Sequence, residues 1–452
     1  MTYPFPRKAK NYIKSRLESG NKKPIILRGA RQVGKTAIVR QISQELGLNL
    51  VELNLDKAED QQNYTGVETV ADLASRIKLT TGADISQKGI LLFIDEIQAQ
   101  PQLIKLLRYI YESYPNLPVI AAGSLLEFYL DKHTDSFPVG RVEYAYMGPL
   151  DFLEFLNAIG KKELARVILE YQPTETMPLG LHKTLMSTYG QYLLVGGMPA
   201  AVDSYIRDGS MEEIISIQKD LLQGIYDDIP KYETANSRKI QIQHVLTYAP
   251  SYAGNVYKYQ NFAGSNYKSR EMQEAFATLE RAGMIYQVQQ TKSQALPITS
   301  SPSGARKLGF IDVGLVNASL DNHENLYEKT IVNSDFTGQI IEQSVLQQIR
   351  YSSTKTLPNV FRWVRDSNKS AAEVDFILRL NGQMSAIEVK AGTSGRLGSL
   401  FSFSDYTNGN ARLVRLYGGL PRFNERLDYD NKSYSVTSLP LYLLPRLGNL
   451  NK

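Results

Sequence analysis

The chain has 452 residues, of which 42% are hydrophobic and 21% charged, and its formal net charge is +5. This composition is ordinary for a globular protein, and the length predicts two to four domains because one core rarely exceeds about 300 residues. The net charge does not by itself indicate nucleic-acid binding, although a local basic face remains compatible with it. The absence of cysteine excludes disulfides and thiolate metal sites. No secretory leader or apolar run of membrane-spanning length is present, so we expect a cytoplasmic protein that does not enter a membrane.

In chain order, apolar strand-like runs first alternate with helical patterns: PIILRG, KTAIVRQISQEL, LNLVELNLD, GILLFIDE and LPVIAAGS. This alternation is typical of an α/β domain with a parallel sheet covered on both faces. The pattern then becomes helical, continues as helices followed by a β-hairpin, and ends as α/β again. We therefore predict four domains: a P-loop ATPase core over 1–155, a helical connector over 156–235, a winged-helix-like domain over 236–325 and a second α/β domain over 326–452.

The first chemical motif is GARQVGKT at residues 29–36, which fits the pattern G-x-x-x-x-G-K-[ST]. It follows a strand-like run and opens a helical pattern, as a phosphate-binding loop requires. Glycines let successive backbone N–H groups turn toward phosphate oxygens, and the helix N-terminus adds partial positive charge. Lys35 is expected to reach the β- and γ-phosphates and Thr36 to ligate Mg²⁺. The predicted ATP contacts are Gly29, Ala30, Arg31, Gln32, Val33, Gly34, Lys35 and Thr36.

A second element is needed to complete the metal site. The run LLFID ends in Asp95 and is followed by Glu96. A central parallel strand would bring Asp95 beside Thr36, where it would help to hold Mg²⁺, and Glu96 would polarise the attacking water. The pair therefore predicts hydrolysis as well as binding.

Two further residues have open roles. Ser124 follows the strand-like run LPVIAAG, where a polar side chain would sense the γ-phosphate, but a turn serine at a strand end is an equal alternative. Arg141 would serve as an arginine finger or sensor, in cis or in trans, and the alternative is a solvated or ion-paired arginine.

A family resemblance rests on these motifs together. GARQVGKT, LLFIDEIQ, GSLLEFYL, the segment from Gly140 through GPLDFLEFL, and YLLVGGMPA resemble AAA-type ATPases of bacteria and archaea that carry an uncharacterised C-terminal domain. The similarity continues into KLGFIDVGLVNA and EVDFIL…IEVK and so covers most of the chain. It implies a nucleoside-triphosphatase core in which Glu96 is catalytic, and it extends to Arg31 in the loop.

The middle of the chain predicts a helix from Lys268 to Arg281 followed by a hairpin, an order that resembles a winged helix. Lys268, Arg270 and Arg281 would face phosphates if this helix entered a DNA groove. The alternative is a module that contacts protein and whose charges are solvated.

Near the C-terminus, two strand-like runs flank Asn381-Gly382, the preferred type I′ hairpin turn. Counting back from a Leu380–Gln383 pair places Asp375 opposite Glu388, and Glu373 opposite Lys390. Carboxylates directly opposed repel each other, and a cation between them relieves the repulsion. Oxygen ligands on rigid strands suit Mg²⁺ or Mn²⁺. Lys390 would activate water or neutralise phosphate charge.

Glu342, on a predicted helix, would add another ligand. Together Glu342, Asp375, Glu388 and Lys390 resemble the PD-(D/E)xK core of restriction-endonuclease-like folds, which implies metal-dependent phosphodiester hydrolysis with Asp375, Glu388 and Lys390 as catalytic residues. The alternatives are a fold that has lost activity and an ordinary cross-strand ion pair between Glu373 and Lys390.

These observations predict a DNA-directed AAA-type ATPase that uses ATP and Mg²⁺ and ends in a nuclease-like domain. The main alternative is an ATP-driven switch in which the C-terminal fold recruits a protein partner and cuts nothing. A third is a chaperone-like remodeller that forms rings. Oligomeric state, pathway and substrate stay open.

Overall fold

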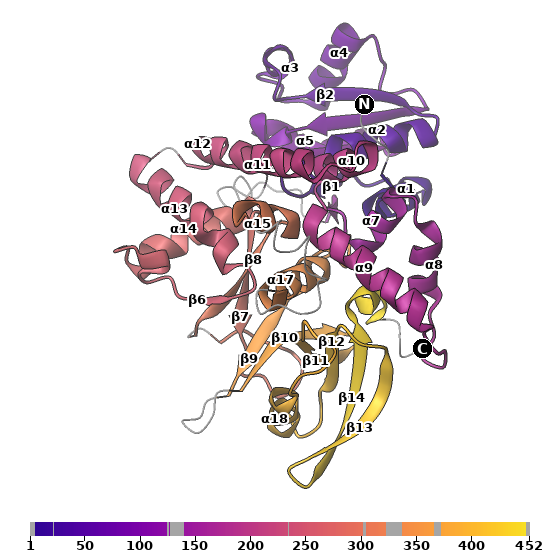
Figure 1. The fold of residues 1–452 in the computed structure, drawn as a ribbon. Helices are drawn as coiled ribbons and strands as arrows, with labels where there is room; N and C mark the ends of the chain where they lie inside the picture. Colours follow the sequence, from indigo (N-terminus) through magenta and orange to yellow (C-terminus); the bar gives the residue numbers. More distant parts are fainter. Residues whose placement is uncertain are drawn as a thin grey trace. The chain divides into compact units, whose positions relative to one another are not determined.

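The computed structural model describes residues 5–20, 22–123, 126, 140–233, 235–301, 304–321, 337–365 and 372–448. They form two compact units (Figure 1). The first contains residues 1–148 with the short segments 281–283 and 353–357, and the second contains the remainder. Across the described ranges, no helix is both long enough and apolar enough to cross a membrane.

The first unit is built on a five-stranded sheet in the order β2-β3-β4-β1-β5. Every strand pair in it is parallel, which confirms the predicted sheet. The fifth strand was not predicted, because its four residues, EYAY, are too few to form a clear apolar run. The strands are β1 (Ile25–Arg28), β2 (Asn49–Asn54), β3 (Ile90–Asp95), β4 (Val119–Gly123) and β5 (Glu143–Tyr146).

Helices bury both faces of the central strands in this unit. All six residues of β3 are buried, and Leu92 and Ile94 share a core cluster with Ile104 and Leu107. Burial of this kind stabilises a parallel sheet, whose strands carry apolar residues on both faces. The helices are α1 (Lys8–Glu18), α2 (Lys35–Glu45), α3 (Ala58–Tyr64), α4 (Val70–Thr81) and α5 (Pro101–Ser113), with the 3₁₀ turn η1 (Ile97–Ala99).

The second unit begins with the helical stretch that the sequence predicts. A capping box fixes the start of its first helix. The side chain of Asp151 accepts from the backbone N–H of Glu154, and the side chain of Glu154 accepts from the backbone N–H of Asp151. The helices are α7 (Phe152–Ala158), α8 (Lys162–Glu170), α9 (Leu179–Val195), α10 (Pro199–Arg207), α11 (Met211–Asp227), α12 (Ile229–Tyr232) and α13 (Asn236–Tyr252).

A mixed nine-stranded sheet completes the second unit, in the order β13-β14-β12-β11-β10-β9-β7-β8-β6. The helix and hairpin predicted after residue 268 are present as α14 (Ser269–Arg281), β7 (Ile285–Gln290) and β8 (Arg306–Phe310), and β8 also pairs with β6 (Val256–Tyr257). Strand β7 pairs in parallel with β9 (Phe361–Val364), so one sheet runs through two of the predicted domain ranges. The four ranges and the name winged helix stay predictions.

The C-terminal part of this sheet has the predicted hairpin. Strands β10 (Glu373–Leu380) and β11 (Gln383–Val389) pair with Leu380 opposite Gln383, which confirms the predicted register. Both turn residues have positive φ, 47° at Asn381 and 82° at Gly382, as a type I′ turn requires. Helix α17 (Thr337–Arg350) packs against β8 and β11. The remaining elements are η3 (Phe262–Gly264), α15 (Val313–Ser319), α18 (Gly398–Tyr406), β12 (Arg412–Tyr417), β13 (Arg422–Tyr429), β14 (Lys432–Pro440) and η4 (Leu441–Arg446).

Candidate nucleotide site and carboxylate centre

The phosphate loop, residues 29–36, lies between the end of β1 and the start of α2, as the motif requires. Gly29 passes so close to the backbone that a Cβ there would lie 2.1 Å from the carbonyl oxygen of Met147. Gly34 has a φ of 96° at the N-cap of α2, and no described side chain caps that helix end. The first N–H groups of α2 are therefore available to an anion, and the helix dipole favours negative charge there.

Lys35 is buried and bends back onto the loop. Its ammonium donates to the carbonyls of Gly29 at 3.0 Å and Ala30 at 2.8 Å. Burial lowers the pKa of Lys35, against the opposing charges of Glu96 and Asp95. The positive charge of Arg31 lowers the same pKa further, so Arg31 lies within electrostatic range of Lys35. Backbone carbonyls are weak partners for an ammonium, and phosphate oxygens would be stronger ones.

Thr36 and Asp95 meet as the sequence predicts. The Thr36 hydroxyl donates to the Asp95 carboxylate at 2.6 Å, which joins the start of α2 to the end of β3. Burial raises the pKa of Asp95, which is only 5% exposed. A hydroxyl and a carboxylate are the hard oxygen donors that Mg²⁺ prefers, so the residues present fit this ion. Thr36 would bind it directly and Asp95 would bind it directly or through water.

Glu96 stands next to this pair in a left-handed conformation with φ of 52°. Its carboxylate accepts from the side-chain amide of Gln98 at 2.6 Å. The other amide atom, Oε1 of Gln98, is buried without a hydrogen-bond partner among the described residues and lies against Gly123 at the end of β4. Gln98 thus fixes the direction of Glu96. Sequence reasoning missed Gln98, because the only signal is an amide two residues beyond the acidic pair.

Arg7 is a second residue that sequence reasoning missed. Its guanidinium is buried and donates to the carbonyls of Val33 at 2.9 Å and Gly148 at 2.5 Å. It therefore braces the phosphate loop from behind. A single arginine 22 residues before the loop carries no sequence signal for this role.

The two residues with open roles fare differently. Ser124 lies outside the described residues, so its sensor role stays a prediction. Arg141 is 48% exposed and lies 3.7 Å from Glu112, which matches the ion-paired alternative. It precedes Glu143, which pairs with Ile25 at the start of β1, whereas the phosphate loop follows the other end of that strand. A role for Arg141 within its own chain therefore has no geometric support, and a role in trans stays a prediction.

The second group, here called the carboxylate centre, consists of Glu342, Glu373, Asp375 and Glu388. Extending the hairpin register by one pair places Asp375 opposite Glu388, as predicted. Asp375 also accepts from the backbone N–H of Val389 at 2.9 Å. Both acids are almost fully buried, at 8% and 5% exposure. The structure thus brings together the acidic side chains that the sequence grouped.

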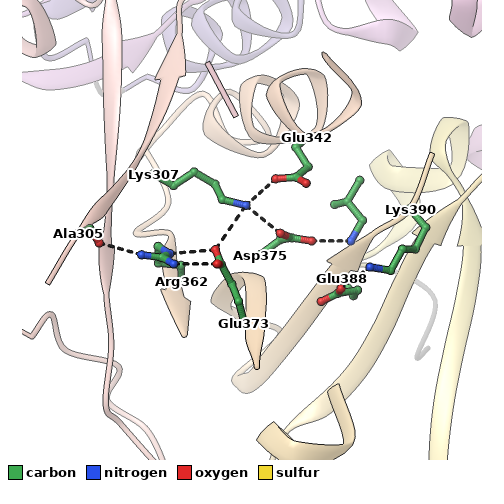
Figure 2. Close-up of polar contacts among 9 residues, drawn as sticks. Ala305, Lys307, Glu342, Arg362, Glu373, Asp375, Glu388 and Lys390 are labelled. Atoms are coloured by element: carbon green, nitrogen blue, oxygen red, sulfur yellow. Dashed lines mark hydrogen bonds and ion pairs between the residues drawn. The ribbon is translucent and has the colours of Figure 1, made fainter. Parts of the chain in front are cut away.

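A lysine from another part of the chain lies among them (Figure 2). The ammonium of Lys307, on β8, is 2.5 Å from Glu342, 2.8 Å from Asp375 and 3.9 Å from Glu373. Burial alone would lower the pKa of Lys307, but the charges of Asp375 and Glu342 outweigh it and raise this pKa. These carboxylates therefore favour the charged form of Lys307. Sequence reasoning missed it because 68 residues separate it from Asp375.

The two remaining acids of the centre, Glu373 and Glu388, also have cationic partners. Arg362 makes a two-pronged contact with Glu373, at 3.1 Å and 2.9 Å. Lys390 pairs with Glu388 at 2.6 Å. The cross-strand ion pair considered between Glu373 and Lys390 was wrong, because Arg362 from β9 lies closer to Glu373 and Lys390 turns to the acid two residues before it.

Burial, together with nearby acids, raises the pKa of two carboxyl groups of the centre. Burial and the charge of Asp375 raise the pKa of Glu388 to about 8 and that of Glu342 to about 7. Across the described ranges, no group of three or more His, Asp or Glu side chains has the arrangement of a metal site. Metal binding by Glu342, Asp375 and Glu388 stays a prediction.

Sequence comparison divides the chain into three matched regions. Residues 21–156 match a family described as AAA domain, residues 186–326 a domain of unknown function designated DUF8612, and residues 337–442 a domain of unknown function designated DUF4143. The parallel sheet and the phosphate loop of the first unit agree with its similarity to AAA domains. No nuclease family is among these matches.

Known structures give a weaker likeness. The Walker-type ATPase PABY2304 of Pyrococcus abyssi is 16% identical with a TM-score of 0.43, covering 70% of this chain and 96% of its own. PCH-2 of C. elegans is 12% identical with a TM-score of 0.31, covering 45% and 63%. No curated protein sequence matches the chain.

Proposed function

We propose that this protein binds ATP with Mg²⁺ on the phosphate loop and hydrolyses it. The carrying observation is the 2.6 Å contact between Thr36 and Asp95 at the start of α2, a helix end that no described side chain caps. A phosphate group at that helix end would accept from the loop N–H groups, and Lys35 would exchange its two carbonyl partners for phosphate oxygens. Thr36 and Asp95 would hold Mg²⁺, and the ion would supply positive charge against the charge that develops during transfer.

Glu96 supplies the base in this proposal. It adjoins the metal residues, and Gln98 holds its carboxylate in one direction. A carboxylate so placed polarises a water molecule for attack on the γ-phosphate, an effect typically worth 10²–10⁴-fold. Asp95 cannot serve as well, because its carboxylate is engaged by Thr36 and by the backbone N–H of Glu96.

The test is steady-state ATP hydrolysis together with equilibrium binding of a fluorescent ATP analogue. We expect Glu96→Gln to keep binding and lose turnover by about 100-fold or more, and Lys35→Ala to lose both. Glu112→Gln is the matched control, since Glu112 is an exposed carboxylate paired with Arg108 on α5. Hydrolysis at the wild-type rate in Glu96→Gln would refute the assignment.

For the C-terminal end we propose the switch rather than a constitutive nuclease. The observation that favours it is Lys307, whose ammonium contacts the acids that a metal would need. With that contact in place, Glu342 and Asp375 are not free to bind a divalent ion together. Incubation of plasmid and single-stranded DNA with Mn²⁺ tests this proposal: we expect no cutting by the wild type. Cutting that disappears in Asp375→Ala would establish a nuclease instead.

DNA contact through α14 completes the proposal. Support comes from the order helix, helix and hairpin, and from Arg270, which is 92% exposed and whose contact with Glu274 is long, at 3.9 Å. A protein partner on the same helix is the competing outcome of the binding test given below.

A further inference from the structure

The carboxylate centre is held together by a cation that comes from outside its own hairpin. Glu342 belongs to α17, Asp375 to β10, and Lys307 to β8, which pairs with β7 and β6. One ammonium with two short contacts therefore ties three elements together. Only 3% of the Lys307 side chain is exposed.

The centre holds more acids than cations. Four acids, Glu342, Glu373, Asp375 and Glu388, face three cations, Lys307, Arg362 and Lys390. Arg362 is engaged by Glu373 and Lys390 by Glu388. Lys307 alone serves both Glu342 and Asp375.

A second observation indicates unused ligand capacity. Oε2 of Glu388 is buried and has no hydrogen-bond partner among the described residues, although Oε1 pairs with Lys390. Glu388 is 5% exposed, so water does not compensate freely for the missing partner. A buried carboxylate oxygen without a partner is costly, and a cation of higher charge beside it would remove that cost.

We propose that Lys307 is a displaceable internal cation that keeps divalent metal ions out of the carboxylate centre, and that the centre binds one when Lys307 withdraws. An ammonium and a metal ion cannot both contact the same oxygens of Glu342 and Asp375, because two cations that close together in a buried site repel each other strongly. The two states exclude each other. The oxygens that Lys307 releases, with those of Glu388, are hard donors suited to Mn²⁺ or Mg²⁺.

This gives the middle of the second unit control over its C-terminal end. Lys307 belongs to the hairpin that follows α14, whereas the acids belong to the elements after residue 337. A partner that moves β8 would withdraw Lys307 from Glu342 and Asp375 and so open the centre to a metal ion. This movement is the physical basis of the switch. The inference rests on the switch proposed for this end of the chain and not on ATP hydrolysis.

The experiment measures Mn²⁺ binding to the full chain without nucleotide, by calorimetry and by the electron paramagnetic resonance signal of free Mn²⁺. We compare wild type with Lys307→Met, which keeps the length of the side chain and removes its charge. Lys307→Gln is a second neutral variant, and Lys432→Met is the matched control because Lys432 is 60% exposed and pairs with Asp405. Trp363 is the only tryptophan and pairs with Val374 of β10, so its fluorescence reports that the domain is folded.

We expect about 100-fold or more tighter Mn²⁺ binding in the neutral variants of Lys307. Adding Asp375→Asn should abolish that gain, which locates the ion in the carboxylate centre. Equal Mn²⁺ affinity in wild type and in both folded neutral variants would overturn the inference. So would a gain that survives Asp375→Asn. Failure here is distinguishable from failure of the proposed switch, because DNA cutting by the wild type tests the switch, whereas the Mn²⁺ affinity of the neutral Lys307 variants tests this inference.

Discussion

The phosphate loop and the carboxylate centre both combine buried acids with buried lysines, but their cations are satisfied in different ways. In the first, Lys35 donates to two backbone carbonyls, which bind it weakly enough to be replaced by phosphate. In the second, Lys307 donates to two carboxylates, which bind it strongly. The same residue type is therefore poised for a ligand in one site and takes the place of one in the other.

The largest expected effect separates the two sites chemically. Asp95→Ala should reduce Mg²⁺-dependent ATP hydrolysis by about 100-fold or more, because it removes the partner of Thr36 at the metal. Asp375→Ala should leave hydrolysis within about twofold. Initial rates at saturating ATP check both. If the two variants lost turnover equally, the two sites would be one functional unit and the comparison would fail.

Stability should show the opposite order. Lys307→Ala leaves Glu342 and Asp375 buried without their cation, a loss that typically costs about 3–5 kcal/mol. Lys35→Ala leaves only backbone carbonyls without a donor and should cost about 1–2 kcal/mol. Urea unfolding followed by Trp363 fluorescence reports the first, and circular dichroism reports both. A larger loss for Lys35→Ala would contradict the different roles given to the two lysines.

A Gln98 variant tests whether its side-chain amide positions the Glu96 carboxylate. Gln98→Ala removes the amide that fixes the Glu96 carboxylate, and we expect kcat to fall about tenfold with little change in KM. Gln102→Ala is the matched control, because Gln102 is a neighbouring amide that donates to Gln100. An equal change in KM would show that Gln98 acts in nucleotide binding instead.

The stability of the second unit should depend on pH. The folded chain holds the pKa of Glu388 at about 8 and that of Glu342 at about 7, against an ordinary value of 4.5. At pH values between the ordinary pKa and the raised pKa, the folded state binds more protons than the unfolded state, so the free energy of unfolding falls as the pH rises. The stabilisation is complete below about 4.5 and is lost through about 7–8. Urea unfolding over this range should show the decline, and Glu388→Gln should flatten it.

The smallest expected effect concerns α14. Arg270→Ala should weaken DNA binding about threefold and reduce its salt dependence, if the helix contacts phosphates. Fluorescence anisotropy with duplex DNA at two salt concentrations measures this, with Lys219→Ala as control, since Lys219 is an exposed lysine on α11 paired with Asp321. If DNA binding is unchanged, α14 does not contact DNA through Arg270, and a protein partner becomes the proposed ligand of this helix.

The sequence predicted what depends on local pattern. The strands β1 to β4 and the phosphate loop followed from apolar runs and glycine spacing, and the hairpin register followed from Asn381 and Gly382. Arg7, Gln98 and Lys307 did not follow, because each acts across a distance in sequence or through one polar contact that leaves no periodic signal. Lys307 matters most, since opposed acids indicate a cation but do not say whether it is a metal or an ammonium.

The most direct test counts metal ions. Wild-type chain is titrated with Mn²⁺ in the presence and absence of a non-hydrolysable ATP analogue, and bound Mn²⁺ is measured by electron paramagnetic resonance. The account predicts one tightly bound ion per chain with the analogue and none without it, because Lys35 exchanges its backbone carbonyls for phosphate oxygens, whereas Lys307 keeps its contacts with Glu342 and Asp375 as long as no partner moves β8. A second tightly bound ion that disappears in Asp375→Asn would contradict it.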